Sequence, residues 1–233
     1  MSRGAGARRT GGARRSDLPI GTMMRDATAM EEPTSRSRIL DATAELLRTQ
    51  GLQGTKLSEV AKRAGMLAPS LYHHFDSKDQ LVEEVLVEGC HRNTRFIVTR
   101  VEVLGANASP LDRLEAAITA HLVFLLARDS YSSAVSRVFR DLPEEMKRRV
   151  LAAYAGFDNY WRDLILAARA SGAARSDIDA TLARKFLINM LDSAAEWYRP
   201  GHLEPVEIAR QACQLFLRGF ADPANGAGDQ NKS

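Results

Sequence analysis

Apolar residues recur at helical spacing along most of the chain. From Ser35 onward, one apolar stripe is followed by a second after a short polar interval: Leu40, Ala44 and Leu47, then Leu57, Val60, Ala61 and Ala64. Residues three or four apart share one face of a helix, whereas a strand alternates apolar and polar residues. Alternation of that kind is nearly absent, so the pattern predicts an all-α fold.

Capping residues and prolines divide this pattern into separate helices. Pro69 fits the first turn of a short helix over 68–74, because a first-turn residue does not need its N–H. Ser77, with Gln80 three residues later, predicts a capping box at the start of a long helix that reaches about residue 104. Further start and stop signals predict helices over about 109–128, 143–170, 177–197 and 205–220.

The composition along the chain predicts two folded domains between two disordered ends. Residues 1–34 hold several arginines among Gly, Ala and Ser. This composition predicts a disordered basic arm, either a solvated tail or a segment that follows a nucleic acid backbone. Residues 35–80 form a compact helical trio and residues 81–221 a larger helical domain. Residues 222–233 are rich in Gly, Asn and Ala and are expected to form a disordered tail.

The overall composition limits the class of protein. The 233 residues are 45% hydrophobic and carry a formal net charge of +3, so a sizeable core is expected and the basic excess is small. No run approaches the roughly 18 apolar residues of a membrane span, and no apolar segment of a secretory signal is found. Cys90 and Cys213 show no metal-ligand spacing and are expected as reduced, buried thiols. We expect a cytoplasmic protein that does not enter a membrane.

The short helix over 68–74 has two different faces. At about 100° per residue, Leu71 and Phe75 fall on one side and are expected to anchor the helix in a small core. The other side is polar and uncharged, with Pro69, Ser70 and His73 at its centre and Tyr72 and His74 on its flanks. Together with the preceding helix and the turn at Gly65, this is the arrangement of a helix-turn-helix. The outward face is a candidate surface for reading double-stranded DNA.

The adjacent histidines indicate neither metal binding nor catalysis. His73 and His74 point in different directions on a helix, and metal-binding pairs need a spacing of three or four residues. No Ser/His/Asp set or carboxylate pair is organised around them. We therefore expect a protein that is not an enzyme and needs no metal or cofactor.

Residues at the starts of two helices are candidates for phosphate contacts. Lys78 lies in the first turn of the long helix, where its ammonium and the free N–H groups can hold a phosphate together. Thr55 and Lys56 open the second helix of the trio and are expected to do the same. The alternative interpretation of Thr55 is a plain N-cap of that helix, and both roles can coexist because the hydroxyl and the backbone donors face the same way.

The segment "RILDATAELLRTQGLQGTKLSEVAKRAGMLAPSLYHHFDSKDQLVEEVL" resembles the DNA-binding domain of the tetracycline-repressor (TetR) family of bacterial regulators. The positions that carry the resemblance are Gly51, Thr55, Ala64, Gly65, Leu71, Tyr72, Phe75, Lys78 and Leu81. The resemblance implies a homodimer of all-helical subunits that binds a palindromic operator and releases it on binding a small molecule. The chain departs from the family at Leu67, where Ser or Thr commonly caps the recognition helix, and at Pro69.

Apolar stripes and their polar interruptions in the larger domain predict an effector cavity. His121 and Phe124 lie on the stripe of the helix over 109–128, and Asn189 interrupts the apolar pattern of the helix that contains Trp197. Each polar residue is either a satisfied buried group or a ligand anchor. Together with further aromatic residues they favour a large apolar pocket with few polar anchors. The candidate ligand-binding residues are His121, Phe124, Tyr131, Phe157, Trp161, Asn189 and Trp197.

The segment "AEWYRPGHLEPVEIA" resembles a subset of the family that regulates fatty-acid and steroid catabolism and whose effectors are often acyl-CoA thioesters. This resemblance implies that the cavity takes an acyl part, with Arg137, Arg140 or Arg162 near the phosphates of the CoA. The small hydrophobic effector is therefore hypothesised to be an acyl-CoA.

The last two helices fit the dimer-forming bundle that the family implies. The helix over 205–220 has two apolar stripes, and small residues follow Asp192 in the helix before it. An intramolecular core would also explain both features. The expected function is a ligand-responsive transcriptional repressor. An activator of the same family, and a helical lipid- or acyl-CoA-binding protein without DNA binding, remain alternatives.

Overall fold

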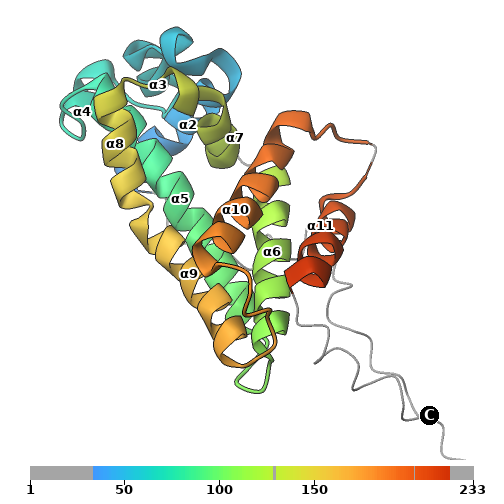
Figure 1. The fold of residues 1–233 in the computed structure, drawn as a ribbon. Helices are drawn as coiled ribbons and strands as arrows, with labels where there is room; N and C mark the ends of the chain where they lie inside the picture. Colours follow the sequence, from blue (N-terminus) through green and yellow to red (C-terminus); the bar gives the residue numbers. More distant parts are fainter. Residues whose placement is uncertain (1–33, 128–129, 202, 221–233) are drawn as a thin grey trace, which may run out of the picture. The chain divides into compact units, whose positions relative to one another are not determined.

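Helices form nearly all the regular structure in a computed structural model that describes residues 34–127, 130–201 and 203–220. They are α2 (Ser35–Gly54), α3 (Leu57–Arg63), α4 (Ala68–Tyr72), α5 (Lys78–Glu102), α6 (Pro110–Leu126), α7 (Ser130–Val138), α8 (Glu144–Ala153), α9 (Ala155–Ala170), α10 (Ala180–Trp197) and α11 (Pro205–Phe220). Figure 1 shows their arrangement. The all-α prediction is confirmed. The predicted basic arm, except its last residue, and the predicted tail lie outside the described residues.

Side-chain caps start several helices where the sequence predicts them. The Ser77 hydroxyl accepts the N–H of Gln80 at the start of α5. The reciprocal contact differs from a capping box, because the Gln80 side chain accepts the N–H of Asp76 instead of that of Ser77. A complete capping box is present at Ser109 and Asp112, at the start of α6. Each cap satisfies N–H groups that have no partner within the helix.

The structure corrects the predicted helices at two places. The helix expected over 143–170 is two helices, α8 and α9, because the backbone of Tyr154 departs from the regular pattern and its N–H bonds to Val150 and Leu151. Helix α7 was not predicted at all. Four of its nine residues are serines, which have only moderate helix propensity. Its helical state depends on packing against α2, which only the fold supplies.

One apolar core joins the helix-turn-helix to the rest of the chain. Leu71 and Phe75 are each only 1% exposed, as predicted, and they pack with buried residues of α2, α3 and α5. The same core includes Tyr131, Ala134 and Val138 of α7 and Met146 and Val150 of α8. The helix-turn-helix therefore shares a core with helices that belong to the larger predicted domain.

The second half of the described chain is arranged around α6. This helix packs against α5 on one side and against α9, α10 and α11 on others, as Figure 1 shows. Nine of its side chains are buried, among them His121. No helix in the described part of the chain is long and apolar enough to span a bilayer. The central position of α6 brings His121 among side chains from α5, α9 and α10.

Candidate DNA-binding surface and effector cavity

The recognition helix α4 is held by its inner face and exposes its outer face. Gly65, with a φ of 69°, makes the turn that leads from α3 towards α4. Such a φ suits glycine because a Cβ would crowd the backbone there. No side chain caps α4, whose N-cap is Leu67, and Pro69 lies in its first turn. Leu67 thus stands where the family commonly has a capping hydroxyl, and the pre-set φ of Pro69 favours the first turn of α4 instead.

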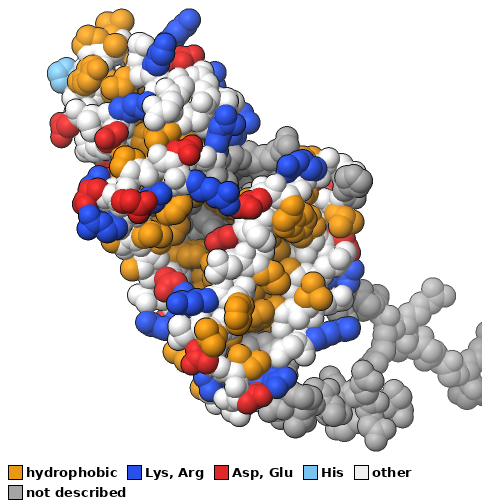
Figure 2. Space-filling model, turned by 45° about the horizontal axis from the view of Figure 1, so that its top comes forward, with side chains coloured by type: hydrophobic (Ala, Val, Ile, Leu, Met, Phe, Trp, Pro, Cys, Tyr) orange, Lys and Arg blue, Asp and Glu red, His pale blue; other side chains and the backbone are white. Residues whose placement is uncertain are grey.

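The predicted reading residues lie on the exposed side of this anchored helix. Tyr72, His73 and His74 are exposed, whereas Ser70 is half-buried. The helix ends at Tyr72, two residues earlier than its predicted limit, and His73 is its C-cap. Figure 2 shows hydrophobic and histidine side chains together at the end of the molecule that carries α4. The surface is largely uncharged, as the sequence predicts for a face that reads base edges.

The predicted phosphate-binding residues differ in their exposure and in the hydrogen bonds that they already make. Lys56 is exposed and is the N-cap of α3, where no side chain supplies a cap. Thr55 is buried, and its hydroxyl donates to the carbonyl of Gly51 at 2.8 Å, so the prediction that Thr55 caps the second helix is wrong. The ammonium of Lys78 donates to the carbonyl of Leu52 at 2.7 Å. Lys78 therefore ties the start of α5 to the end of α2.

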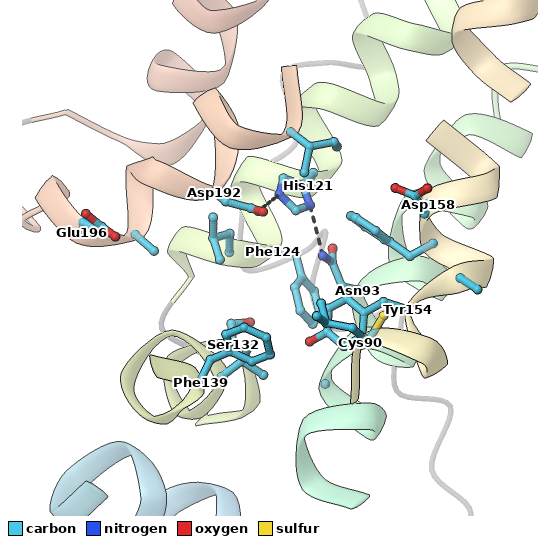
Figure 3. Close-up of a pocket in the computed structure, with 18 of the residues that line it drawn as sticks. Cys90, Asn93, His121, Phe124, Ser132, Phe139, Tyr154, Asp158, Asp192 and Glu196 are labelled. Carbon is cyan, nitrogen blue, oxygen red and sulfur yellow. Dashed lines mark hydrogen bonds and ion pairs between the residues drawn. The ribbon is translucent and has the colours of Figure 1, made fainter. Parts of the chain in front are cut away.

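A cavity of about 700 Å³ lies between α5, α6, α7, α8, α9 and α10. Its apolar lining includes Phe124, Phe139, Tyr154, Phe157 and Ile188. Its polar lining includes Asn93, His121, Ser132, Arg140, Asp158, Asp192 and Glu196. Figure 3 shows these side chains converging from helices that are far apart in the sequence. A large, mainly apolar cavity with a few polar groups is typical of small-molecule sites.

His121 is the centre of a hydrogen-bonded chain across the cavity wall. The ring is only 2% exposed, with Nε2 at 3.0 Å from Oδ1 of Asp192 and Nδ1 at 3.0 Å from Nδ2 of Asn93. A carboxylate only accepts, so Nε2 carries the proton and Nδ1 accepts from the Asn93 amide. This leaves Oδ1 of Asn93 as a buried acceptor that has no partner among the described residues. The chain of three side chains, drawn in Figure 3, gives one wall of the cavity its polarity.

Charged residues at the cavity are mostly neutralised by neighbours. Arg140 pairs with Glu196, and Arg184 pairs with Asp158. Asp192 instead faces the ring of His121. Arg140 is the only one of the three predicted CoA-binding arginines among the residues that line the cavity. Of the other two, Arg137 lies beside Gly51 and Arg162 beside Asp163.

The structure brings only three of the seven predicted ligand residues into the cavity lining: His121, Phe124 and Phe157. Trp161 is fully buried behind them, edge-on to His121 at 5.8 Å between ring centroids. The Tyr131 hydroxyl donates to Asp41 instead, and the exposed amide of Asn189 donates to the carbonyl of Lys185. Trp197 is 56% exposed and lines a separate apolar groove between α10 and α11.

The sequence analysis missed Asn93 as a member of the cavity lining. Asn93 lies three and four positions after Cys90 and Gly89, and all three residues line the cavity. That spacing places them on one face of α5. A polar and two small residues on one face of a long helix were the available signal. The signal was hidden because α5 is long and its first half packs in the core shared with the helix-turn-helix.

Comparison with known proteins identifies the family. Residues 39–85 match the family model described as bacterial regulatory proteins, tetR family, and residues 107–220 match the model described as tetracyclin repressor-like, C-terminal domain. The HTH-type transcriptional repressor KstR2 of Rhodococcus jostii (strain RHA1) is 34% identical over 202 residues, covering 82% of this chain and 93% of the relative. The chain belongs to the TetR family. The predicted family and the predicted regulatory, non-enzymatic class are thereby confirmed.

Two solved structures show a fold similar to that of this chain. The ketosteroid transcriptional regulator KstR2 of Mycobacterium tuberculosis is 24% identical, with a TM-score of 0.64, and the match covers 82% of this chain and 97% of that one. AibR, solved in complex with isovaleryl coenzyme A and operator DNA, is 21% identical, with a TM-score of 0.67, covering 78% and 97%. The predicted helix-turn-helix followed by a helical second domain is the fold of this family.

The cavity thiol provides a test of the burial seen at the site. Burial raises the pKa of Cys90 to about 11 and that of Cys213 to about 12, and both thiols are free, as predicted. At pH 8 we expect a Cys213→Ser variant to react with iodoacetamide through Cys90 about 100-fold more slowly than an ordinary exposed thiol, because the thiolate is the nucleophile. The rate should rise as the pH approaches 11, and unfolding in urea should remove the protection. Rapid labelling of the folded variant at pH 8 would contradict the burial of Cys90.

Proposed function

We propose that this chain is a cytoplasmic, homodimeric transcriptional repressor that binds operator DNA and releases it when a small hydrophobic effector enters the cavity. One structural observation supports this proposal most directly. An exposed recognition helix, anchored by Leu71 and Phe75, shares its core with helices that also line a cavity of about 700 Å³. For a hundredfold loss of operator affinity, the effector must favour the non-binding form by about 2.7 kcal/mol. One buried small molecule can provide that difference.

Operator recognition is assigned to the outer face of α4. In a helix-turn-helix dimer, two such helices enter successive major grooves about 34 Å apart. Tyr72, His73 and Ser70 are the proposed base-reading residues, with His74 on their flank. Lys56 and Lys78 are the proposed phosphate contacts, and Thr55 supports the connection between α2 and α3 through its bond to Gly51. The exposure of Tyr72 and His73 and the family assignment support this placement.

Alanine substitutions should separate base reading from phosphate binding. His73→Ala should weaken binding to the upstream DNA of the chain's own gene about tenfold while leaving binding to unrelated duplex nearly unchanged. Lys56→Ala should weaken both and lower the salt dependence by about one counterion. Fluorescence anisotropy over a salt series measures both, with His91→Ala on the exposed side of α5 as the matched control. Absence of any preference of the wild type for upstream DNA would instead favour a lipid-binding protein without DNA binding.

The homodimer is assigned to the outward side of α10 and α11. Leu182, Phe186 and Trp197 follow one another along α10, and each is more than half exposed, Phe186 by 70%. Trp197 and the exposed Leu215 of α11 also line the apolar groove between the two helices. Hydrophobic side chains are prominent on this side of the molecule (Figure 2). Exposed apolar surface of this extent marks an interaction site, and the family's dimers are the natural occupants.

A charge on this surface should break the dimer. Phe186→Glu should raise the dimer dissociation constant at least about tenfold, because burying an unpaired carboxylate in an apolar interface costs several kcal/mol. Light scattering after size exclusion at micromolar concentration measures the change from dimer to monomer. Val103→Glu, at an exposed apolar residue after the end of α5, should leave the dimer intact. If Phe186→Glu has the molar mass of a dimer, as Val103→Glu should, the interface lies elsewhere.

The effector is proposed to be an acyl-CoA whose apolar part fills the cavity. The walls formed by Phe124, Phe157 and Ile188 suit such a part, and the isovaleryl coenzyme A in the AibR complex is a ligand of this class. Carboxylates outnumber arginines along the lining, so the phosphates of CoA need a cation at the edge. Arg140 is exposed and pairs with Glu196, and it can exchange that partner for a phosphate.

A thermal-shift panel tests this assignment. Isovaleryl-CoA or palmitoyl-CoA at about 100 times its dissociation constant should stabilise the protein by about 2.7 kcal/mol, or roughly 5–10 °C. Arg140→Ala should reduce the shift from the thioester but not a shift caused by a neutral steroid. Arg148→Ala, at an exposed arginine paired within its own helix, is the control. Stabilisation by the neutral steroid alone would remove the acyl-CoA hypothesis and keep the apolar cavity.

A further inference from the structure

Helix α7 carries two stripes of side chains with different surroundings. Its buried stripe belongs to the core shared with the helix-turn-helix, and its second stripe, extended by one residue beyond the helix, lines the effector cavity. The first stripe is Tyr131, Ala134 and Val138, and the second is Ser132, Val135 and Phe139. The two stripes are offset by one residue, or about 100° around the helix axis. A nine-residue helix moves as a unit, so a displacement on the cavity side reaches the other side.

The contact between α7 and α5 leaves little room for α7 to move towards α5. Gly89 of α5 lies directly under α7, where an added Cβ would be 3.3 Å from Cγ2 of Val135 and 3.5 Å from Cβ of Tyr131. The absence of a side chain at Gly89 allows the two backbones to approach closely. On its buried side, α7 packs most extensively against α2. An occupant that presses on Val135 is therefore expected to shift α7 relative to α2.

Three polar side chains define the position of α7 on α2. The hydroxyl of Tyr131 donates to Oδ1 of Asp41, a residue of α2, at 2.8 Å. The guanidinium of Arg92, a residue of α5, lies 3.2 Å from the same Asp41 oxygen and 3.9 Å from the centroid of the Tyr131 ring. Arg92 is itself held by Glu88 at 2.9 Å. Apolar contacts between α2 and α7 tolerate sliding, whereas this Asp41–Arg92–Tyr131 cluster has a defined geometry.

We infer that Tyr131 is the positioning residue that passes occupancy of the cavity to the helix-turn-helix, through its hydroxyl bond to Asp41. This inference rests on the proposed function. Movement of α7 by an occupant pulls on Asp41 and thereby on α2, which carries the core that anchors α4. Without the hydroxyl, the aromatic ring still fills its place in the core, but α7 can slide over α2. The variant should therefore bind both DNA and effector with weakened communication between them.

A double-mutant cycle tests the inference without knowledge of the natural effector. Val135→Phe enlarges a side chain on the cavity stripe of α7 and stands in for an occupant. It should lower affinity for the upstream duplex about tenfold in the wild-type background. In the Tyr131→Phe background the same change should lower affinity less than about twofold. Tyr160→Phe, at a residue of α9 that belongs neither to the core shared with the helix-turn-helix nor to the cavity lining, is the matched control and should preserve the tenfold effect.

Two results would overturn the inference: the same tenfold loss in the Tyr131→Phe background, or an unchanged affinity in Val135→Phe alone. If circular dichroism shows that Val135→Phe is unfolded, Val135→Leu replaces it and the same comparison decides. If the wild type shows no preference for the upstream duplex, the proposed function fails independently. In that case the rate of amide hydrogen exchange in α2 is measured instead. Val135→Phe must change this rate in the wild-type background and must leave it unchanged in the Tyr131→Phe background. Any other pattern refutes the role of Tyr131.

Discussion

The apolar packing of α7 and α8 against the helix-turn-helix is the contact on which the rest of the structure depends. Three short helices bury too little apolar surface to be stable alone, and here their core continues into Tyr131, Val138 and Val150. Since both helices also line the cavity, the stability of the DNA-binding surface and the shape of the ligand site have common supports. A regulator with this arrangement needs no separate element to connect its two sites.

The polar groups differ between the DNA-binding surface, the cavity and the region between them. On the exposed face of α4 they are uncharged and open to a partner. In the cavity they form one hydrogen-bonded chain, Asn93–His121–Asp192, within a mainly apolar lining. Between the two sites, Asp41, Arg92 and Tyr131 bond to one another where α2, α5 and α7 meet. Asp41 is exposed and Arg92 half-buried, but Tyr131 is buried, and the hydroxyl of a buried tyrosine needs a hydrogen-bond partner. The paired cluster therefore favours one relative position of the helices that it joins.

The position of the effector cavity also follows from the environment of α6. Phe124 and His121 reach the cavity from this helix, while other residues of α6 face α11. A helix with neighbours on several sides needs apolar residues around most of its circumference, so its sequence alone does not show which face meets a ligand. The same ambiguity explains why Asn189 and Trp197 were predicted as ligand residues, although both are exposed on the outer side of α10.

The sequence by itself determined the all-α fold, the helix-turn-helix, its anchors Leu71 and Phe75, and most helix starts, because these depend on periodicity and on caps within a few residues. The tertiary structure alone decided the rest. Helix α7 forms because α2 covers it, which is a contact between residues about 90 positions apart. The break at Tyr154, the bond between Lys78 and Leu52, and the meeting of Asn93, His121 and Asp192 likewise require distant segments to come together. Local patterns carry no information about such contacts, since the free energy that stabilises them comes from packing between helices.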